Sequence, residues 1–369
     1  MKILIKALMP SFGDLILATG PLRLLKEQRN NPKIFLLTKF PEILQGNPFI
    51  ACVFTRESEA FSFCYDEIID LSMVNFADEE NITFNYAHLL DIKWRNPWEL
   101  APQIFLYKEE IMWAKSLVAK QVPIGKKICV VHPSTHKFYW EGRNWSLEGF
   151  KVIIERLQNL GYFVIEIGKR IRSTKISDLS LIDQTSLREL ASIISLSDLF
   201  VGIDSGPFHL AQAFKIKSIV IFGPTEPYSR IIDFKFSSFI RNESLTCIGC
   251  YNRKGVSNLN KCERGTIECM KQLNPTYVAD EIERMLKNPL YFANKNIAYL
   301  QQLLQNKNKK LQKESYYMKY TNIHKEYLRY RKGYYAFFRW LYAIRQKIIT
   351  INHFFHKNFF KFRAKNKKP

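Results

Sequence analysis

The chain has 369 residues, of which 47% are hydrophobic and 24% charged, a globular composition that excludes a wholly disordered or collagen-like protein. At roughly 100–200 residues per domain, the length allows two or three domains. No apolar stretch approaches the roughly 18 residues needed to span a bilayer, which excludes a transmembrane protein. Lysine interrupts the N-terminal segment too early for a signal peptide, so we expect a cytoplasmic location.

The net charge of +21 is concentrated near the C-terminus. Residues 287–369 contain 20 Lys and Arg against two acidic residues, together with 19 of the 52 aromatic residues. The preceding 286 residues contain 35 basic and 32 acidic residues. The sequence therefore predicts a nearly neutral globular body and a basic, aromatic tail, which need separate explanations.

In the body, short apolar runs alternate with segments of helical spacing, a pattern that predicts parallel sheets covered by helices. The first group of expected strands is 3–5, 33–37, 51–54 and 67–71, with a helix over 15–27 and no firm assignment for 75–98. The pattern restarts with strands expected at 127–132, 162–167, 199–203 and 218–222, and with helices opening after Ser146, at the capping box Ser186–Glu189 and at Pro207. We expect two α/β units that divide near residues 120–126.

The first strand-to-helix turn, 11–14, carries a carboxylate, Asp14, at the carboxyl edge of the predicted sheet. Ligands of open α/β folds bind at this edge, so Asp14 is a candidate functional residue. The alternative is that Asp14 caps the helix or meets its positive end. The turn matches neither the dinucleotide fingerprint nor the phosphate loop, which argues against an NAD enzyme and a P-loop kinase.

Two further turns have the composition of anion sites. In the segment 202–209 a strand ends at Asp204, Ser205 and Gly206 form a small turn, and His209 falls in the first turn of a helix. Amides exposed at such a helix start suit a diphosphate; the alternative is a well-capped helix with Asp204 as a structural acceptor. The loop 132–137, followed by Arg143, offers hydroxyls and cations for phosphate oxygens, or is simply solvated.

These features occur in one order, and together they resemble family-nine glycosyltransferases, the ADP-heptose:lipopolysaccharide heptosyltransferases. The resemblance covers roughly residues 1–286. Its motifs are Gly13-Asp14, His132-Pro133, Asn144-Trp145-Ser146, the helix start 185–190, the turn 204–210 and the segment 222–227.

The resemblance implies an α/β fold of GT-B type, with two Rossmann-like domains facing across a cleft. It places an acceptor-side domain at 1–122 and a nucleotide-sugar-binding domain at 123–286. The remaining segment, 287–369, is expected to be a mainly helical tail.

The resemblance also implies roles for individual residues, without a metal or other cofactor. Asp14 matches the family's general base. The donor diphosphate and nucleoside are expected to be bound by Ser134, Thr135, Lys137, Arg143, Asp204, Ser205, Gly206 and His209. Many members have lysine where this chain has Arg143, so either Arg143 or Lys137 contacts the diphosphate. The family's acidic ribose contact has no clear counterpart near 168–170, which leaves the nucleotide open.

Four cysteines, Cys247, Cys250, Cys262 and Cys269, have roughly the spacing of a four-thiolate zinc site. The alternative is that they are free or redox-labile thiols.

The tail has three interpretations. Cations interleaved with aromatic residues suit the surface of an anionic membrane, whereas a helical appendage packed on the body and a nucleic-acid-binding segment are alternatives, nucleic acid being the weakest.

The resemblance implies an inverting glycosyltransferase that moves heptose from ADP-heptose onto a lipid-linked glycan such as the lipopolysaccharide core, at the inner face of the cytoplasmic membrane. The alternatives are another nucleotide-sugar donor in the synthesis of capsule or another surface glycan, and an inactive binding protein whose tail binds nucleic acid.

Overall fold

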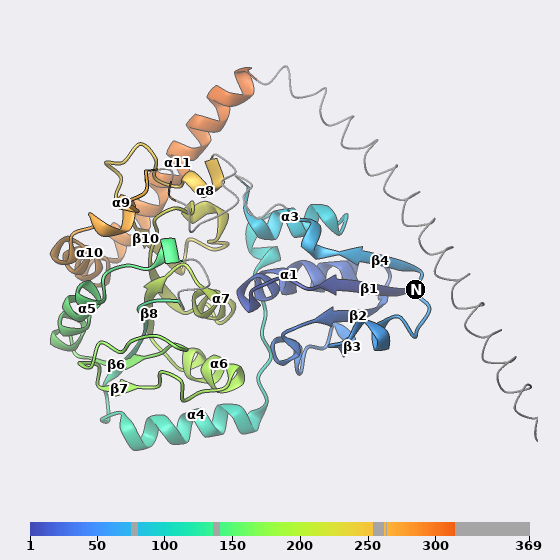
Figure 1. Cartoon of the computed structure of the whole chain (residues 1–369), viewed down its shortest axis with the longest axis horizontal. Helices are drawn as coiled ribbons and strands as arrows, with labels where there is room; N and C mark the ends of the chain where they lie inside the picture. The colour runs from blue at the N-terminus through green and yellow to red at the C-terminus, as the bar shows by residue number, and fades with distance from the viewer. Residues whose placement is uncertain (75–79, 136–140, 254–261, 263, 314–369) are drawn as a thin grey trace, which may run out of the picture. The chain divides into compact units, whose positions relative to one another are not determined.

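The computed structural model describes residues 1–74, 80–135, 141–253, 262 and 264–313. The chain divides into one compact unit, Met1–Ile297, and a second that begins at Ala298. The first unit contains two separate parallel sheets (Figure 1). Of the second unit, the structure describes the continuation of one helix, α11 (Pro289–Lys313).

The first sheet has four parallel strands in the order β3-β2-β1-β4. Their bounds are β1 (Lys2–Ala7), β2 (Lys33–Thr38), β3 (Ile50–Phe54) and β4 (Glu67–Asp70). The side chains of Ile3, Leu4 and Ile5 in the central strand are fully buried, because a parallel sheet is covered on both faces. All four predicted strands are confirmed.

The helices of this half are α1 (Phe12–Gln28), η1 (Pro41–Leu44), α2 (Glu57–Ala60), η2 (Leu71–Met73), α3 (Ile82–Leu89), η3 (Pro97–Leu100) and α4 (Lys108–Gln121). Helix α1 begins three residues earlier than the periodicity predicts, because the Ser11 hydroxyl accepts the amide hydrogen of Gly13 and caps it. Helix α3 lies in the stretch that the sequence left unassigned, and the side chain of Asn81 caps it.

The second sheet has six parallel strands in the order β10-β9-β8-β5-β6-β7. Their bounds are β5 (Lys127–His132), β6 (Tyr162–Glu166), β7 (Leu179–Ser180), β8 (Leu199–Ile203), β9 (Lys217–Ile221) and β10 (Ser237–Ile240). The four predicted strands of this half are confirmed. The two edge strands were not predicted, because β7 has only two residues and β10 opens with two serines.

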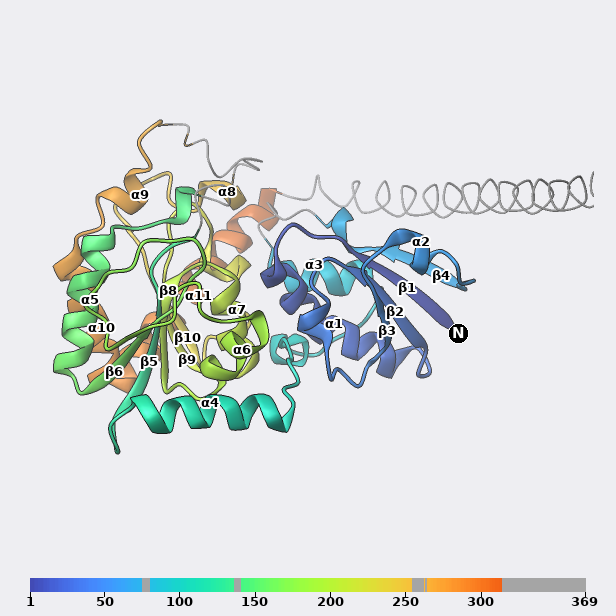
Figure 2. The same cartoon turned by 60° about the horizontal axis from the view of Figure 1, so that its bottom comes forward.

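The helices of this half are η4 (Glu141–Arg143), α5 (Leu147–Asn159), α6 (Leu187–Ser195), α7 (Gly206–Ala213), η5 (Pro227–Ser229), α8 (Cys250–Arg253), α9 (Glu268–Lys271) and α10 (Pro275–Lys287). Ser146 caps α5 and the capping box of Ser186 and Glu189 opens α6, both as predicted. Helices α5 and α10 lie side by side on the flank of this sheet (Figure 2).

Helix α4 precedes the second sheet in the chain but packs against its helix α6. The Arg188 guanidinium of α6 pairs with the Glu110 carboxylate of α4, at 2.6 Å, and donates to the carbonyls of Glu42 and Phe105. Arg188 is buried. This single side chain therefore ties the second half to three segments of the first.

The body continues past the position at which the basic composition begins. The side chain of Phe292 packs into the core of the second sheet. The Asn296 carboxamide accepts from the Ser238 hydroxyl, at 2.7 Å, and donates to the carbonyls of Phe234 and Ser237. Residues 289–297 are thus part of the packed body although composition groups them with the tail. The described helices are each too short or too polar to cross a lipid bilayer.

Candidate functional site

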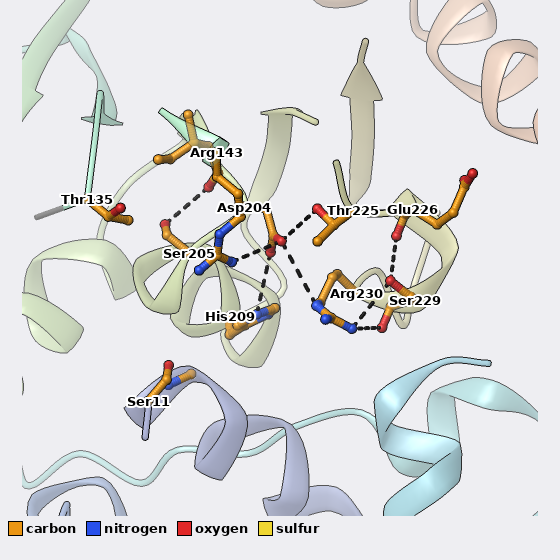
Figure 3. A network of polar contacts seen from close by, with 12 residues as sticks. Ser11, Thr135, Arg143, Asp204, Ser205, His209, Thr225, Glu226, Ser229 and Arg230 are labelled. Atoms are coloured by element: carbon orange, nitrogen blue, oxygen red, sulfur yellow. Dashed lines mark hydrogen bonds and ion pairs between the residues drawn. The ribbon is translucent and has the colours of Figure 1, made fainter. Parts of the chain in front are cut away.

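The starts of α1 and α7 meet, each directly after a central strand of its sheet. A Cβ on Gly13 would lie 2.8 Å from Cδ2 of His209 and 3.0 Å from Cα of Gly206, and a Cβ on Gly206 would overlap the ring of Phe12. Figure 3 shows Ser11, the N-cap of α1, opposite the turn that holds Asp204 and His209. The two turns that the sequence singled out separately are therefore one site.

Asp204 is the centre of a buried network (Figure 3). Its Oδ2 pairs with Nη1 of Arg143 at 3.0 Å, accepts from the Thr225 hydroxyl at 2.9 Å, and lies 3.9 Å from Nε of Arg230. Burial alone would raise the pKa of Asp204, but the positive charges of Arg143 and Arg230 hold it below its ordinary value. Asp204 is thus ionised and accepts hydrogen bonds within the protein.

The other carboxylate oxygen of Asp204, Oδ1, differs from Oδ2 in its hydrogen bonding. Oδ1 is buried and accepts no hydrogen bond from the residues that the structure describes; Nε2 of His209 lies 3.9 Å from it. Buried carboxylate oxygens ordinarily have a hydrogen-bond donor. This oxygen is therefore suited to accept from a hydroxyl group or water.

Asp14 lies in the first turn of α1 and is half-buried. It is not the cap of the helix, since Ser11 has that position. Burial raises the pKa of Asp14 to about 6, against the opposing charges of Arg230 and Arg143 and with the help of the negative charge of Asp204. A carboxylate with this pKa is ionised at neutral pH and is a stronger base than an exposed aspartate.

Arg230 belongs to the same site, and the sequence did not single it out. It follows η5 directly, is buried, and donates through Nη1 to the Ser229 carbonyl at 3.1 Å. The Asn81 amide donates to the carbonyls of Tyr228 and Ile231, at 2.7 and 2.9 Å, and so ties this segment to α3 of the first half. Arg230 lies beyond both β9 and η5 in the chain, so its place at the site has no local sequence signal.

His209 is buried beside the network. Burial lowers its pKa to about 3, helped by Arg230 and Arg143 and opposed by Asp204, so its imidazole is neutral. His132, at the end of β5, is also neutral because burial lowers its pKa to about 3. Its Nδ1 lies 2.9 Å from the Ser205 hydroxyl, so the Ser205 side chain is occupied within the protein.

The loop after β5 is held by Asn144. Thr135 donates through its amide and hydroxyl to Oδ1 of Asn144, at 2.7 and 3.2 Å, and the Asn144 amide donates back to the Thr135 carbonyl at 3.0 Å. Ser134 beside it is half-buried. Lys137, the alternative to Arg143 as a phosphate contact, lies outside the described residues.

An acidic side chain does lie at the carboxyl end of β6, where a ribose contact would be expected. Glu166 is fully buried and accepts hydrogen bonds from the Ser173 and Ser177 hydroxyls and from the amide and hydroxyl of Thr174, at 2.8–3.2 Å. Its carboxylate is therefore used to fix the loop 173–177.

The four cysteines lie in one region. Burial raises the pKa of the Cys269 thiol to about 12, and Cys250, Cys262 and Cys247 add to this shift through their charge. None forms a disulfide. Within the described residues, no group of three or more His, Cys, Asp or Glu side chains is arranged to hold a metal ion.

Comparison with known proteins identifies similar chains. Residues 98–231 match the family model of Glycosyltransferase family 9 (heptosyltransferase). Lipooligosaccharide heptosyltransferase 2 of Campylobacter jejuni is 27% identical over 183 residues, which are 44% of this chain and 52% of that protein. The chain thus spans about half the length of the curated relatives that it matches first.

Among solved structures, the ADP-heptose lipopolysaccharide heptosyltransferase II of Escherichia coli has a TM-score of 0.58 at 14% identity, covering 78% of this chain and 98% of that one. The dodecameric iron-containing heptosyltransferase TibC, solved with ADP-D-β-D-heptose, has a TM-score of 0.59 at 15% identity. The match covers 77% of this chain and 76% of that one. These likenesses confirm the α/β fold of GT-B type.

Proposed function

We propose that this chain, a heptosyltransferase-like protein of glycosyltransferase family 9, is an inverting glycosyltransferase that moves heptose from ADP-heptose onto a lipid-linked glycan of the lipopolysaccharide core. The observation that carries the proposal is the position of Asp14. Its carboxylate, with a pKa of about 6, stands at the start of α1 where this helix meets the Asp204–His209 turn of α7. A base and a group of cations are thereby brought together from two sheets.

In the proposed reaction, Asp14 accepts the proton of the acceptor hydroxyl as its oxygen attacks the anomeric carbon. The bond between that carbon and the diphosphate breaks, and the diphosphate leaves with the electron pair. A pKa near 6 suits this role, because the carboxylate is ionised at neutral pH and still basic enough to assist proton transfer.

The leaving diphosphate needs positive charge beside it. Arg143 and Arg230 supply two guanidinium groups next to Asp204, and arginine recognises phosphate through paired hydrogen bonds. We propose that they stabilise the diphosphate, with the backbone amides at Ser205 and Gly206 and the neutral His209. Ser134 and Thr135 line the same sheet edge, and Lys137 stays a candidate. Because cationic side chains take this role, we expect chelators to leave activity in place.

The donor nucleotide stays open. Glu166 is committed to the loop 173–177 and is not available to a ribose hydroxyl, whichever nucleotide carries it. Another nucleotide sugar, used for capsule or another surface glycan, is the second candidate.

We also propose that the acceptor determines where the protein works. A lipid-linked acceptor is confined to a membrane surface, and the residues beyond 297 carry 18 Lys and Arg against two Glu. Such a segment attracts anionic lipid. The proposed location is cytoplasmic, on the inner face of the cytoplasmic membrane.

The test is a donor panel with the full-length protein. ADP-heptose, other ADP-sugars, and GDP- and UDP-sugars are each supplied with and without a lipopolysaccharide-core acceptor, and the released nucleoside diphosphate is measured. We expect ADP release from ADP-heptose that depends on the acceptor. Release from a different donor alone would favour the second candidate. Donor binding without release from any donor would identify a binding protein instead.

A further inference from the structure

Gln212 joins three parts of the site from one buried position. It lies on α7, three residues after His209, so the two side chains share a face of the helix. Its Oε1 accepts the amide hydrogen of Ile232 at 3.0 Å, and its Nε2 donates to the carbonyl of Arg230 at 3.0 Å. The same Nε2 lies 3.0 Å from Nδ1 of His209.

The two backbone contacts determine which end of the Gln212 carboxamide is which. A backbone N–H can only donate and a backbone carbonyl can only accept. The oxygen of Gln212 must therefore face Ile232 and its NH2 group must face Arg230. The group opposite Nδ1 of His209 is then a donor, and Nδ1 has to accept. A neutral imidazole that accepts at Nδ1 carries its proton on Nε2.

We propose that Gln212 is a positioning residue that holds His209 as the neutral tautomer with its proton on Nε2. That proton is directed toward Asp204, whose Oδ1 lies 3.9 Å away without a hydrogen bond from the described residues. His209 then has one N–H to offer, to Asp204 or to an oxygen of a ligand between them. What this ligand is rests on the proposed function, whereas the tautomer does not.

The charged groups around His209 act in opposite senses: Asp204 favours the protonated imidazole, whereas Arg230 and Arg143 disfavour it. Asp204 faces it from the β8–α7 turn, Arg230 from the segment after η5, and Arg143 from η4, while Gly13 of α1 packs on its ring with Asp14 next in the chain. A second proton on Nδ1 would place N–H against the NH2 group of Gln212. Gln212 therefore opposes the charged form in addition to selecting the tautomer.

His132 provides a contrast within the same protein. Its Nδ1 faces the Ser205 hydroxyl at 2.9 Å, and that hydroxyl also lies 3.1 Å from the Ile203 carbonyl. A hydroxyl either donates or accepts by rotating. Ser205 thus leaves the tautomer of His132 open, and only the anchored amide of Gln212 selects one.

The direct test is the nitrogen chemistry of His209 in the full-length protein. The chain has seven histidines, so long-range proton–nitrogen NMR of 15N-histidine-labelled protein can resolve them, with His209 assigned from the signals lost in His209→Asn. We expect the Nε2–H tautomer and no protonation between pH 5 and 8. An Nδ1–H tautomer, or a charged His209 at pH 6, would overturn the proposal, whether or not the protein transfers sugar.

Two variants extend the test. Gln212→Leu removes the donor and should leave His209 as a mixture of tautomers. Gln212→Glu places a carboxylate opposite Nδ1 and should protonate it, so that His209 titrates between pH 5 and 8 and donor KM acquires the same pH dependence. Gln158→Glu is the matched control, since Gln158 also donates to a backbone carbonyl, that of Ile176, but on α5; it should change neither readout. Unchanged His209 signals in a folded Gln212→Leu protein would contradict the proposal.

Discussion

Gly13 and His209, one at the start of α1 and the other in the first turn of α7, are packed so closely that a Cβ on Gly13 would lie 2.8 Å from Cδ2 of the imidazole. Real Cβ atoms essentially never approach another heavy atom this closely. The glycine therefore allows the two sheets to bring their helix starts into contact. The proposed base and the proposed donor site owe their proximity to this pair.

The Gly13→Ala variant should weaken this contact. Overpacking of this kind costs about 1–3 kcal/mol, and we expect kcat/KM for the complete reaction to fall by about tenfold or more because Asp14 is displaced from Asp204. The measurement is acceptor-dependent nucleotide release, with unfolding followed in parallel. Gly161→Ala is the control, because Gly161 has a positive φ of 88° but no atom within 4 Å of a Cβ. It should lose stability and keep its activity.

The pH dependence of transfer should report Asp14. Protonation of its carboxylate removes the base, so kcat/KM for the acceptor should fall as pH drops through about 6, where the pKa lies. A pH–rate profile from pH 5 to 8.5 measures this. An acidic limb near pH 4, the ordinary range of an aspartate, would show that burial does not tune Asp14.

The same shift affects stability. The folded-state pKa of Asp14, about 6, lies above the ordinary aspartate value of 3.8. Between these values the folded state holds more protons than the unfolded state, so this contribution to the free energy of unfolding decreases as pH rises through the window. Asp14→Asn removes it. Relative to wild type, the variant should therefore be more stable at pH 7.5 than at pH 4; the opposite trend would mean a lowered pKa.

The buried ion pair of Arg143 and Asp204 should contribute much more to the free energy of unfolding than an exposed ion pair of similar length. Removing one member of a buried ion pair leaves an uncompensated charge and costs about 3–5 kcal/mol, so Asp204→Asn should lower the free energy of unfolding by that order and weaken donor binding. Glu148→Gln is the control: it breaks the exposed contact with Lys151, at 2.9 Å, which is worth under about 1 kcal/mol. Equal free energies of unfolding for Asp204→Asn and Glu148→Gln would contradict the central place of Asp204 in the buried network.

Much of this fold follows from local pattern. The buried strands are short apolar runs, and the caps at Ser146 and Ser186 are satisfied as their spacing predicts. Strand β10 escaped prediction because Ser237 and Ser238 are buried polar residues, with the Ser238 hydroxyl satisfied by distant Asn296. This hydrogen bond joins residues that are far apart in the sequence, so no local pattern predicts it.

The site was predicted in its parts and not in its assembly. Asp14 and Asp204 each lie in a turn that follows a strand, at the carboxyl edge of the sheet, where ligands of open α/β folds bind. Arg230 and Gln212 do not follow such a rule. Arg230 reaches Asp204 from a segment that Asn81 ties to α3, and Gln212 acts through the backbone of residues 230 and 232. Contacts between such distant segments are set by the whole fold.

The membrane interpretation of the tail can be tested by truncation. A chain ending at Lys313 keeps every described element and lacks 14 Lys and Arg, two Glu and 16 aromatic residues. It should fold and transfer sugar to a soluble acceptor analogue but lose binding to vesicles that contain anionic lipid. Sedimentation with anionic and with zwitterionic vesicles measures this, and high salt should release the full-length protein only in part.

A chain ending at Lys287, where the basic composition starts, should be much less stable, because it lacks Phe292 and Asn296. Vesicle binding by the Lys313 chain equal to that of the full-length protein would contradict a membrane role for the tail.

We propose Asp14 as the general base of a glycosyltransferase, and the Asp14→Asn variant tests this role most directly. The measurement is the single-turnover rate of ADP release from ADP-heptose in the presence of acceptor, with donor affinity determined separately by calorimetry. We predict a donor affinity close to that of wild type and a rate lower by about 10²-fold or more, the scale of a lost general base. A folded Asp14→Asn protein that turns over at the wild-type rate would contradict the account and leave Asp14 as a residue that only favours the start of α1.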